Sequence, residues 1–200
     1  SDVCSSDLLK SIQVHWLLHR MGLQKVRTHT RQVEHEVLER YVQGQRHIVE
    51  LGVFEGASSL MLRKAMAVDG KLWCVDPFPR GRFGISYQYL IANREVNKST
   101  NGTVGFVQKL SHEAVKGWQE PIDLLFIDAD HSYQAVRRDW DDWSPYVKAG
   151  GIIALHDSRT LKYPGVLKLV KEITADEGAY RNVEEVATLT VFEKLANDIE

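Results

Sequence analysis

The sequence predicts an α/β protein with a central, mostly parallel seven-stranded sheet and helices on both faces. Five short, nearly continuous apolar runs alternate with segments of helix length, a pattern typical of parallel strands buried on both sides. Two more apolar runs near the C-terminus indicate a hairpin that closes the sheet with an antiparallel strand. With 200 residues, 44% hydrophobic and 26% charged, the chain suits one domain with a real core.

Two helices are expected before the first strand. Apolar residues at helical spacing cover residues 9–23 and end near Gly22, and a second helix is expected over residues 31–43. We predict that residues 9–43 together form a lid over the site or a dimer element. Residues 44–200 would form the main, cofactor-binding domain.

The parallel strands are expected where the short apolar runs lie: His47–Leu51, residues 72–75, residues 104–107, Ile122–Ile127 and residues 151–155. A helix over residues 132–147 carries Trp140 and Trp143 at helical spacing, and we interpret these tryptophans as core residues. The hairpin is expected at residues 183–186 and 189–192. Residues 77–102, rich in Gly, Arg and aromatic residues, are expected to be irregular.

Composition limits the classes of partner and compartment. A net charge of −2 gives no general reason to expect nucleic acid. Residues 10–33 hold five cations and no acid, which we interpret as a solvated helix face rather than a patch for an anionic substrate, lipid headgroup or partner subunit. Cys4 and Cys74 form no disulfide or zinc pattern, which fits a cytoplasmic protein, and no run is long enough to span a membrane. Residues 1–8 lack an initiating Met and periodicity, so we expect a non-native or disordered tail.

The turn after the first strand indicates a small-molecule cofactor site. Glu50 ends an apolar strand, and Gly52 and Gly56 follow it where a helix begins. Glycine there permits positive φ and a close approach of ligand to backbone. The dinucleotide fingerprint needs a glycine where this chain has Phe54, because the pyrophosphate must fit there, so the spacing disfavours a dinucleotide.

Polar residues follow the other strands, at the sheet edge where ligands of open α/β sheets bind. Asp76 follows the second strand, where a carboxylate can accept both ribose hydroxyls of an adenosyl group. Ser111, after the third strand, would meet an adenine edge or cap a helix. The fourth strand ends in Phe-Ile-Asp-Ala-Asp-His at residues 126–131, and the fifth in Leu-His-Asp-Ser at residues 155–158. Carboxylates and imidazoles that converge in this way are costly unless they bind something.

These blocks resemble a known family. Glu50, Gly52 and Gly56 resemble motif I of the class I S-adenosylmethionine-dependent methyltransferases. Residues 48–157 are similar to bacterial small-molecule O-methyltransferases related to catechol and caffeoyl-CoA O-methyltransferases. The resemblance implies a Rossmann-like methyltransferase fold with S-adenosylmethionine as cofactor, bound by Glu50, Gly52, Gly56, Asp76, Ser111 and Asp128.

The resemblance also implies chemistry at the last two strand ends. Asp128, His156 and Asp157 stand where relatives hold a divalent cation, here Mg²⁺ or Mn²⁺, although relatives usually carry Asp-Asn in place of His156-Asp157. His131 stands where relatives have the basic Lys that takes the proton from the acceptor hydroxyl. A histidine with an ordinary pKa of about 6.5 can accept that proton near neutral pH.

The predicted reaction is methyl transfer from S-adenosylmethionine to a hydroxyl of a small molecule, assisted by a divalent metal. Acceptor contacts are expected from Arg80, Arg82, Phe83 and Tyr87 after the second strand. A homodimer through the N-terminal helices is also expected. Alternatives are an NAD(P)-dependent oxidoreductase on a similar fold, a non-catalytic cofactor-binding protein, and a metal-independent methyltransferase.

Overall fold

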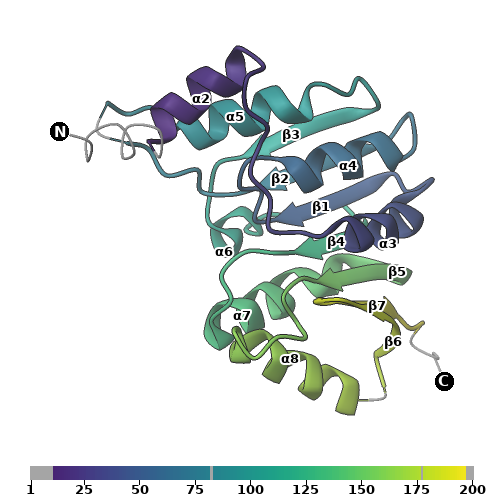
Figure 1. The fold of residues 1–200 in the computed structure, drawn as a ribbon. Coiled ribbons are helices and arrows are strands. Elements are labelled where there is room, and N and C mark those ends of the chain that lie inside the picture. Colours follow the sequence, from purple (N-terminus) through teal and green to yellow (C-terminus); the bar gives the residue numbers. More distant parts are fainter. Residues whose placement is uncertain (1–10, 82, 177, 197–200) are drawn as a thin grey trace.

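A computed structural model describes residues 11–81, 83–176 and 178–196 of the chain. Its centre is one seven-stranded sheet with the strand order β3-β2-β1-β4-β5-β7-β6 (Figure 1). Neighbours from β3 to β5 pair in parallel, whereas β7 pairs antiparallel with both β5 and β6. Only β7 therefore runs against the other strands of the described sheet, which confirms the predicted topology.

The strands agree closely with the apolar runs in the sequence: β1 (His47–Leu51), β2 (Lys71–Val75), β3 (Thr103–Val107), β4 (Ile122–Ile127), β5 (Val147–Leu155), β6 (Tyr180–Val186) and β7 (Leu189–Lys194). The helices are α2 (Ile12–Arg20), α3 (Gln32–Val42), α4 (Ala57–Ala65), α5 (Tyr87–Val96), α6 (Ser111–Ala114), α7 (Tyr133–Trp143) and α8 (Pro164–Ala175), with a 3-10 turn η1 (Ser144–Tyr146). The expectation that residues 77–102 are irregular is wrong, because α5 occupies the middle of that segment.

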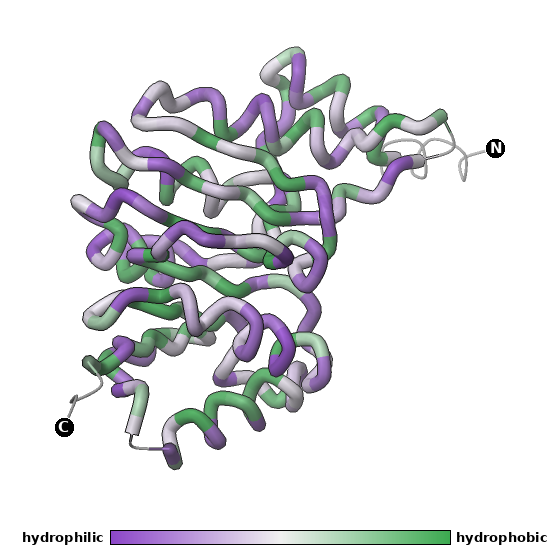
Figure 2. The backbone as a smooth tube through the Cα atoms, turned by 180° about the vertical axis from the view of Figure 1, so that it is seen from behind, coloured by the Kyte–Doolittle hydropathy of each residue, from purple (hydrophilic) through white to green (hydrophobic). Residues whose placement is uncertain are grey.

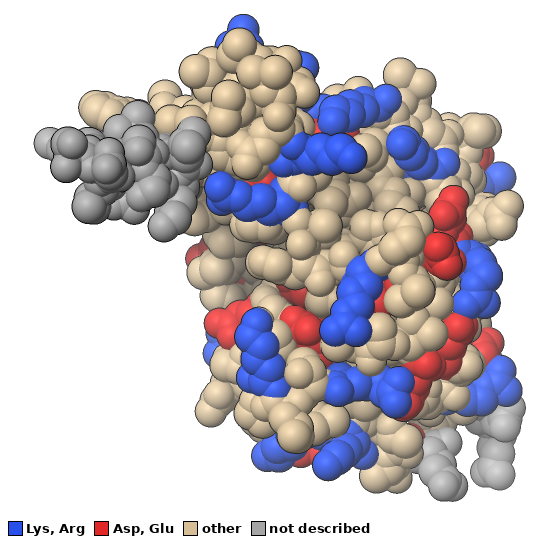
Figure 3. Space-filling model, in the orientation of Figure 1, with Lys and Arg blue, Asp and Glu red and all other residues tan. Residues whose placement is uncertain are grey.

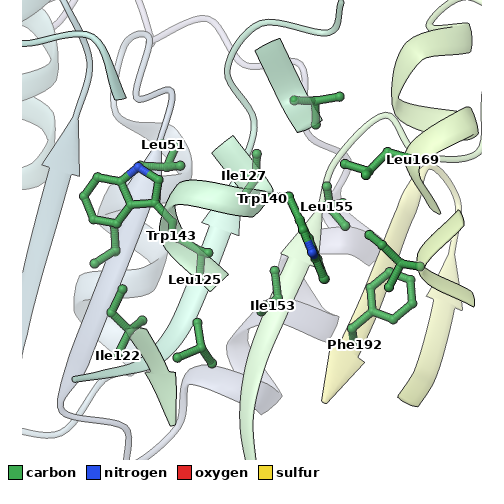
Figure 4. Packing of buried hydrophobic residues seen from close by; sticks show 14 of the residues in the cluster. Leu51, Ile122, Leu125, Ile127, Trp140, Trp143, Ile153, Leu155, Leu169 and Phe192 are labelled. Atoms are coloured by element: carbon green, nitrogen blue, oxygen red, sulfur yellow. The ribbon is translucent and has the colours of Figure 1, made fainter. Parts of the chain in front are cut away.

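Helices cover both faces of the sheet and divide the core in two. Alternate side chains of the strands pack with α3, α4 and α5 on one face and with α7 and α8 on the other (Figure 1). Trp140 and Trp143 of α7 lie among buried strand residues on the second face (Figure 4). They are only 5% and 0% exposed, so their interpretation as core is confirmed. Along α8, hydrophobic and hydrophilic stretches alternate in Figure 2, as expected for a helix with one buried face.

The segment before β1 is attached to the body of the domain. Helix α2 packs on α5, and α3 packs on α4. His15 and His19 of α2 are buried and face the carboxylates of Glu55 and Glu95, at 2.8 and 3.5 Å. The expectation that this stretch is a solvated face is therefore wrong for two of its three histidines, His15 and His19, whereas His29 is exposed.

The visible surface carries both signs of charge. In Figure 3, Lys and Arg side chains alternate with Asp and Glu over the face that Figure 1 also shows. Among the described residues, no helix is both long and apolar enough to cross a membrane.

Candidate active site

A cavity of about 630 Å³ lies at the carboxyl ends of the parallel strands, where the sequence predicts a ligand. Its wall combines the turn after β1, the ends of β2, β4 and β5, the start of α6, part of α7 and a segment of the N-terminal region. The predicted residues on this wall are Gly52, Asp76, Ser111, Asp128, His131 and Asp157. Of the predicted cofactor, metal and catalytic residues, Glu50, Gly56 and His156 do not line the cavity.

Gly52 and Gly56 are required by the packing of the chain on itself. Gly52 has a φ of +87°, and a Cβ there would be 2.1 Å from the carbonyl oxygen of Asp128. Gly56 has a φ of +82°, and its Cβ would meet Val96 and Ala92 of α5 at 3.0 to 3.2 Å. Both glycines are therefore explained by the close approach of β1 to the end of β4 and of α4 to α5.

Glu50 lies inside the domain, behind the turn. Its carboxylate is fully buried and accepts hydrogen bonds from the Ser58 and Ser59 hydroxyls at the start of α4. Burial outweighs these hydrogen bonds and raises the pKa of Glu50 to about 8. Glu50 therefore joins β1 to α4 as a neutral acid near pH 7.

Asp76 reaches back to the same turn. One carboxylate oxygen accepts the backbone N–H groups of Val53 and Phe54, at 3.0 and 3.1 Å, and the other accepts that of Phe78 at 2.8 Å. Asp76 lines the cavity and is 8% exposed. It therefore fixes the shape of the glycine turn and still presents a carboxylate edge to a ligand.

Ser111 lines the cavity, but its hydroxyl is already engaged. It donates a hydrogen bond to Asp139 of α7, whose pKa is raised to about 6 because the carboxyl is buried. Ser111 is the first residue of α6 and Leu110 is its N-cap, so the alternative capping role for Ser111 is wrong. Sequence reasoning missed Asp139, whose partner is 28 residues away in the chain.

The ends of β4 and β5 bring four polar side chains together as predicted. Ligand atoms of Asp128, His131, His156 and Asp157 all lie within 4.8 Å of one another. Burial alone would raise the pKa of Asp128, but the neighbouring imidazoles of His131 and His156 outweigh it and lower the pKa. Asp157 has a φ of +54°, a backbone strain that aims its side chain at this group.

His156 is held on both ring nitrogens. Nδ1 lies 3.0 Å from Oδ1 of Asp128, and Nε2 lies 3.2 Å from Oε2 of Glu34 in α3. Burial would lower the pKa of His156, but the two carboxylates raise it to about 10. An imidazole that donates from both nitrogens has no lone pair for a metal, so the ligand role that the resemblance implies would require His156 to give up its bond to Asp128 or to Glu34.

His131 has the free nitrogen that His156 lacks. Its Nε2 is buried without a hydrogen-bond partner, 3.2 Å from Oδ2 of Asp157 and 3.6 Å from Oδ1 of Asp128. The ring stacks on Tyr163 with centroids 4.1 Å apart and stands between the cavity and a shallower hollow lined by Tyr163 and Pro164. Two carboxylates and one orphaned imidazole nitrogen fit a divalent cation.

The predicted acceptor residues lie apart from this wall. Phe83 is 80% exposed, Arg80 is exposed, and Tyr87 packs edge-to-face on Trp16 of α2. None of these three is among the described residues that line the cavity. Arg82 lies outside the described residues.

Residues 27–30, which we name the N-terminal strap, supply a wall that the sequence did not reveal. Arg27, Thr28, His29 and Thr30 all line the cavity. His29 stacks on Phe54, with ring centroids 5.3 Å apart. At the start of the strap, the backbone N–H of Arg27 donates to the buried carboxylate of Glu55 at 2.6 Å.

Glu34 is the other residue that sequence reasoning missed. It is fully buried and accepts the backbone N–H of Arg31 at 2.7 Å, directly after the strap. Its partners His156 and Thr188 are 122 and 154 residues away in the chain, so no local pattern identifies it. Burial would raise the pKa of Glu34, but its hydrogen bonds lower it to about 2.

Two curated relatives match part of the chain. The uncharacterized protein R132 of Acanthamoeba polyphaga mimivirus is 31% identical over 143 residues, covering 64% of this chain and 59% of that protein. Tricin synthase 1 of Oryza sativa subsp. japonica is 31% identical over 91 residues, covering 44% of this chain and 36% of that protein. The chain therefore spans less than two thirds of the length of either relative.

Solved structures share the fold. The O-methyltransferase TomG of Streptomyces achromogenes, in complex with SAM, has a TM-score of 0.63 at 14% identity, covering 92% of this chain and 88% of that chain. This likeness confirms the Rossmann-like methyltransferase fold. The family model described as a methyltransferase domain matches residues 49–158, more than half of the chain, from β1 to the residue after the His156-Asp157 pair. The protein therefore belongs to this family of class I S-adenosylmethionine-dependent methyltransferases.

Proposed function

We propose that the protein transfers a methyl group from S-adenosylmethionine to a hydroxyl of a small molecule. The observation that carries this proposal is the single cavity wall shared by the glycine turn at Gly52, the Asp76 carboxylate and the Asp128, His131 and Asp157 group. A cofactor along the first part of that wall would point its reactive end toward the second part. Holding nucleophile, methyl carbon and sulfur in line would supply most of the acceleration.

The cofactor half of the wall offers backbone and carboxylate groups. Asp76 would hold the ribose hydroxyls, as its exposed edge and its position after β2 suggest. The turn that Glu50 and Gly56 stabilise would receive the methionine part of the cofactor beside Gly52. Ser111 and Asp128 both line the cavity, and there Ser111 would meet the adenine edge and Asp128 would complete the cofactor side of the wall.

The acceptor half offers His131. Its buried, unpartnered Nε2 can take the proton of an acceptor hydroxyl as methyl transfer proceeds, which is general-base catalysis. A divalent cation would be held by Asp128, Asp157 and the same nitrogen. When bound it would supply a Lewis acid that lowers the pKa of the hydroxyl. These two roles of His131 exclude each other, because one lone pair serves either a proton or a metal.

A nicotinamide-dependent oxidoreductase is the alternative on a similar fold, and Phe54 weighs against it. Its ring lines the cavity and stacks on His29 where a dinucleotide would place its pyrophosphate. A non-catalytic cofactor-binding protein would keep the same wall without turnover. A net charge of −2 favours a small acceptor over nucleic acid.

Calorimetric titration with S-adenosylmethionine and with NAD⁺ tests the cofactor. We expect S-adenosylmethionine alone to bind, and Asp76→Ala to weaken it at least tenfold. Asp123→Asn is the control. Asp123 is also a buried carboxylate, but it accepts hydrogen bonds from the backbone N–H groups of Arg46 and His47 at the amino ends of β1 and β4, away from the cavity at their carboxyl ends. Preference for NAD⁺ would overturn the proposal.

Methyl transfer is tested with radiolabelled S-adenosylmethionine and a panel of catechols, flavonoids and sugars. We expect label in at least one hydroxylated acceptor. Cofactor binding without transfer to any member of the panel would favour the non-catalytic alternative.

A further inference from the structure

Glu34 is a buried carboxylate that does not reach the cavity. It lies in the first turn of α3 and is 0% exposed. It accepts hydrogen bonds from the backbone of Arg31 at 2.7 Å and from the backbone and hydroxyl of Thr188 at 2.9 and 2.7 Å. These contacts fix the carboxylate from two elements, so it is a rigid acceptor. Its remaining partner is Nε2 of His156, at 3.2 Å.

His156 connects the fixed Glu34 carboxylate to Asp128 on the cavity wall. A histidine ring on a terminal sp³–sp² torsion has broad, roughly two-fold freedom when nothing holds it. Here Glu34 of α3 holds one nitrogen, and Asp128 after β4 holds the other at 3.0 Å. The ring cannot turn without breaking both bonds. Because His156 is 2% exposed, water cannot readily replace either of them.

The atoms on the far side of His156 belong to the cavity wall. Oδ1 of Asp128 lies between Nδ1 of His156 at 3.0 Å and Nε2 of His131 at 3.6 Å. Oδ2 of Asp157 lies 3.6 Å from the same Nδ1 and 3.2 Å from Nε2 of His131. Nδ1 of His156 is thus close to both carboxylates, those of Asp128 and Asp157, that face His131.

We propose that Glu34 is a positioning residue that acts through His156 to fix the Asp128 and Asp157 carboxylates around His131. The inference rests on the proposed function for its catalytic consequence, although the positioning itself is a property of the fold. Outer partners that orient active groups typically change activity 10- to 100-fold when they are removed. Helix α3, from outside the family-matched segment, would thereby complete the site.

The test compares Glu34→Gln with wild type in the full chain. The amide keeps the shape of the carboxylate but has one acceptor oxygen, which can serve the two Thr188 donors on Oε1, whereas the NH₂ group would replace Oε2, the acceptor for Arg31 and the partner of His156. Glu34→Ala leaves a hole and can fail to fold. Asp123→Asn is the matched control, because Asp123 is also buried and also accepts two backbone N–H groups, but it contacts Lys148 instead of the site.

The first readout is the long-range ¹H–¹⁵N NMR spectrum of the histidine rings, without ligand. The His131 signal is assigned by its loss in His131→Gln. We expect Glu34→Gln to shift the ring nitrogens of His131, which Glu34 does not touch, and Asp123→Asn to leave them unmoved. Unmoved His131 signals in Glu34→Gln, or equal shifts in both variants, would overturn the positioning role.

The second readout is kcat and KM on the best acceptor of the panel. We expect Glu34→Gln to lower kcat about 10- to 100-fold and to change the KM for S-adenosylmethionine less than threefold. Asp123→Asn, at equal folded concentration, is expected to keep wild-type kcat. If wild type neither binds the cofactor nor turns over, the proposed function fails, and the NMR spectra still decide the role of Glu34.

Discussion

Gly52 lies so close to the end of β4 that a Cβ at this position would stand 2.1 Å from the carbonyl oxygen of Asp128. The nearest atoms are backbone, and the β1–β4 pairing holds them, with Asp128 N–H donating to the Leu51 carbonyl at 2.8 Å. No rotation of a side chain can relieve the overlap. The glycine is therefore fixed by the fold before any ligand is considered.

Gly52→Ala is expected to reduce the free energy of unfolding by more than about 4 kcal/mol or to prevent folding. Gly44→Ala is the control, since Gly44 also has positive φ, at +79°, but has nothing within 4 Å of its Cβ position. It should lose only about 1 kcal/mol, from backbone strain alone. Urea denaturation of both variants measures the difference, and similar losses would show that the predicted clash is unimportant.

Glu50 is expected to make the domain less stable as pH rises. Its folded pKa of about 8 exceeds the ordinary value of 4.5, so the folded state keeps a proton that the unfolded chain has lost. The contribution of Glu50 to the free energy of unfolding is largest below about pH 4.5 and declines as the pH rises to about 8. Glu50→Gln should remove that decline and increase stability at pH 8 by roughly 1–3 kcal/mol. Urea midpoints between pH 5 and 8 test this, and parallel curves for the two proteins would contradict it.

Glu34 should act in the opposite direction, at acid pH. Its folded pKa of about 2 lies below the ordinary 4.5, so its contribution is present above about pH 4.5 and is lost as pH falls toward 2. Glu34→Gln should flatten the acid limb of the stability curve while lowering stability at pH 7. Acid unfolding followed by circular dichroism measures this pH dependence in both proteins. An unchanged acid limb in Glu34→Gln would show that other carboxylates dominate the loss of stability at acid pH.

Mn²⁺ binding should depend on His131. Its orphaned Nε2 and the Asp128 and Asp157 carboxylates form the donor set, so His131→Gln should weaken Mn²⁺ binding at least tenfold in calorimetry. His112→Gln is the control, because His112 lines the same cavity outside that group. If EDTA leaves turnover unchanged and His131→Gln abolishes it, His131 is the base and the metal role is excluded.

Strands β1 and β4 could be predicted to the residue because both are buried along nearly their whole length, so each is a nearly continuous apolar run. Strand β5 begins four residues earlier than expected, at Val147, and β6 begins three residues earlier, at Tyr180. Helix α5 was missed because its residues mix polar and apolar types and follow a segment rich in Gly and Pro. Local sequence therefore predicts elements that are buried along their whole length, and it predicts poorly a helix that is only partly buried.

The site divides in the same way. Asp76, Asp128 and Asp157 could be found because each follows a recognisable strand. Glu34 could not, since its role depends on His156, 122 residues later. The role of His156 also could not be predicted from the sequence. The Glu34 carboxylate occupies its second ring nitrogen, and this contact is visible only in the structure.

The N-terminal strap is pinned at both ends by carboxylates inside the domain. Arg27 donates its backbone N–H to Glu55, and Arg31, directly after the strap, donates its own to Glu34. Three residues lie between Arg27 and Arg31, and the four residue steps from one to the other span at most about 14 Å of extended chain, so the strap has little slack. Trimming this outer wall would strip two buried acids of their partners. An engineer who wants a wider cavity must therefore replace side chains on the strap and keep its backbone.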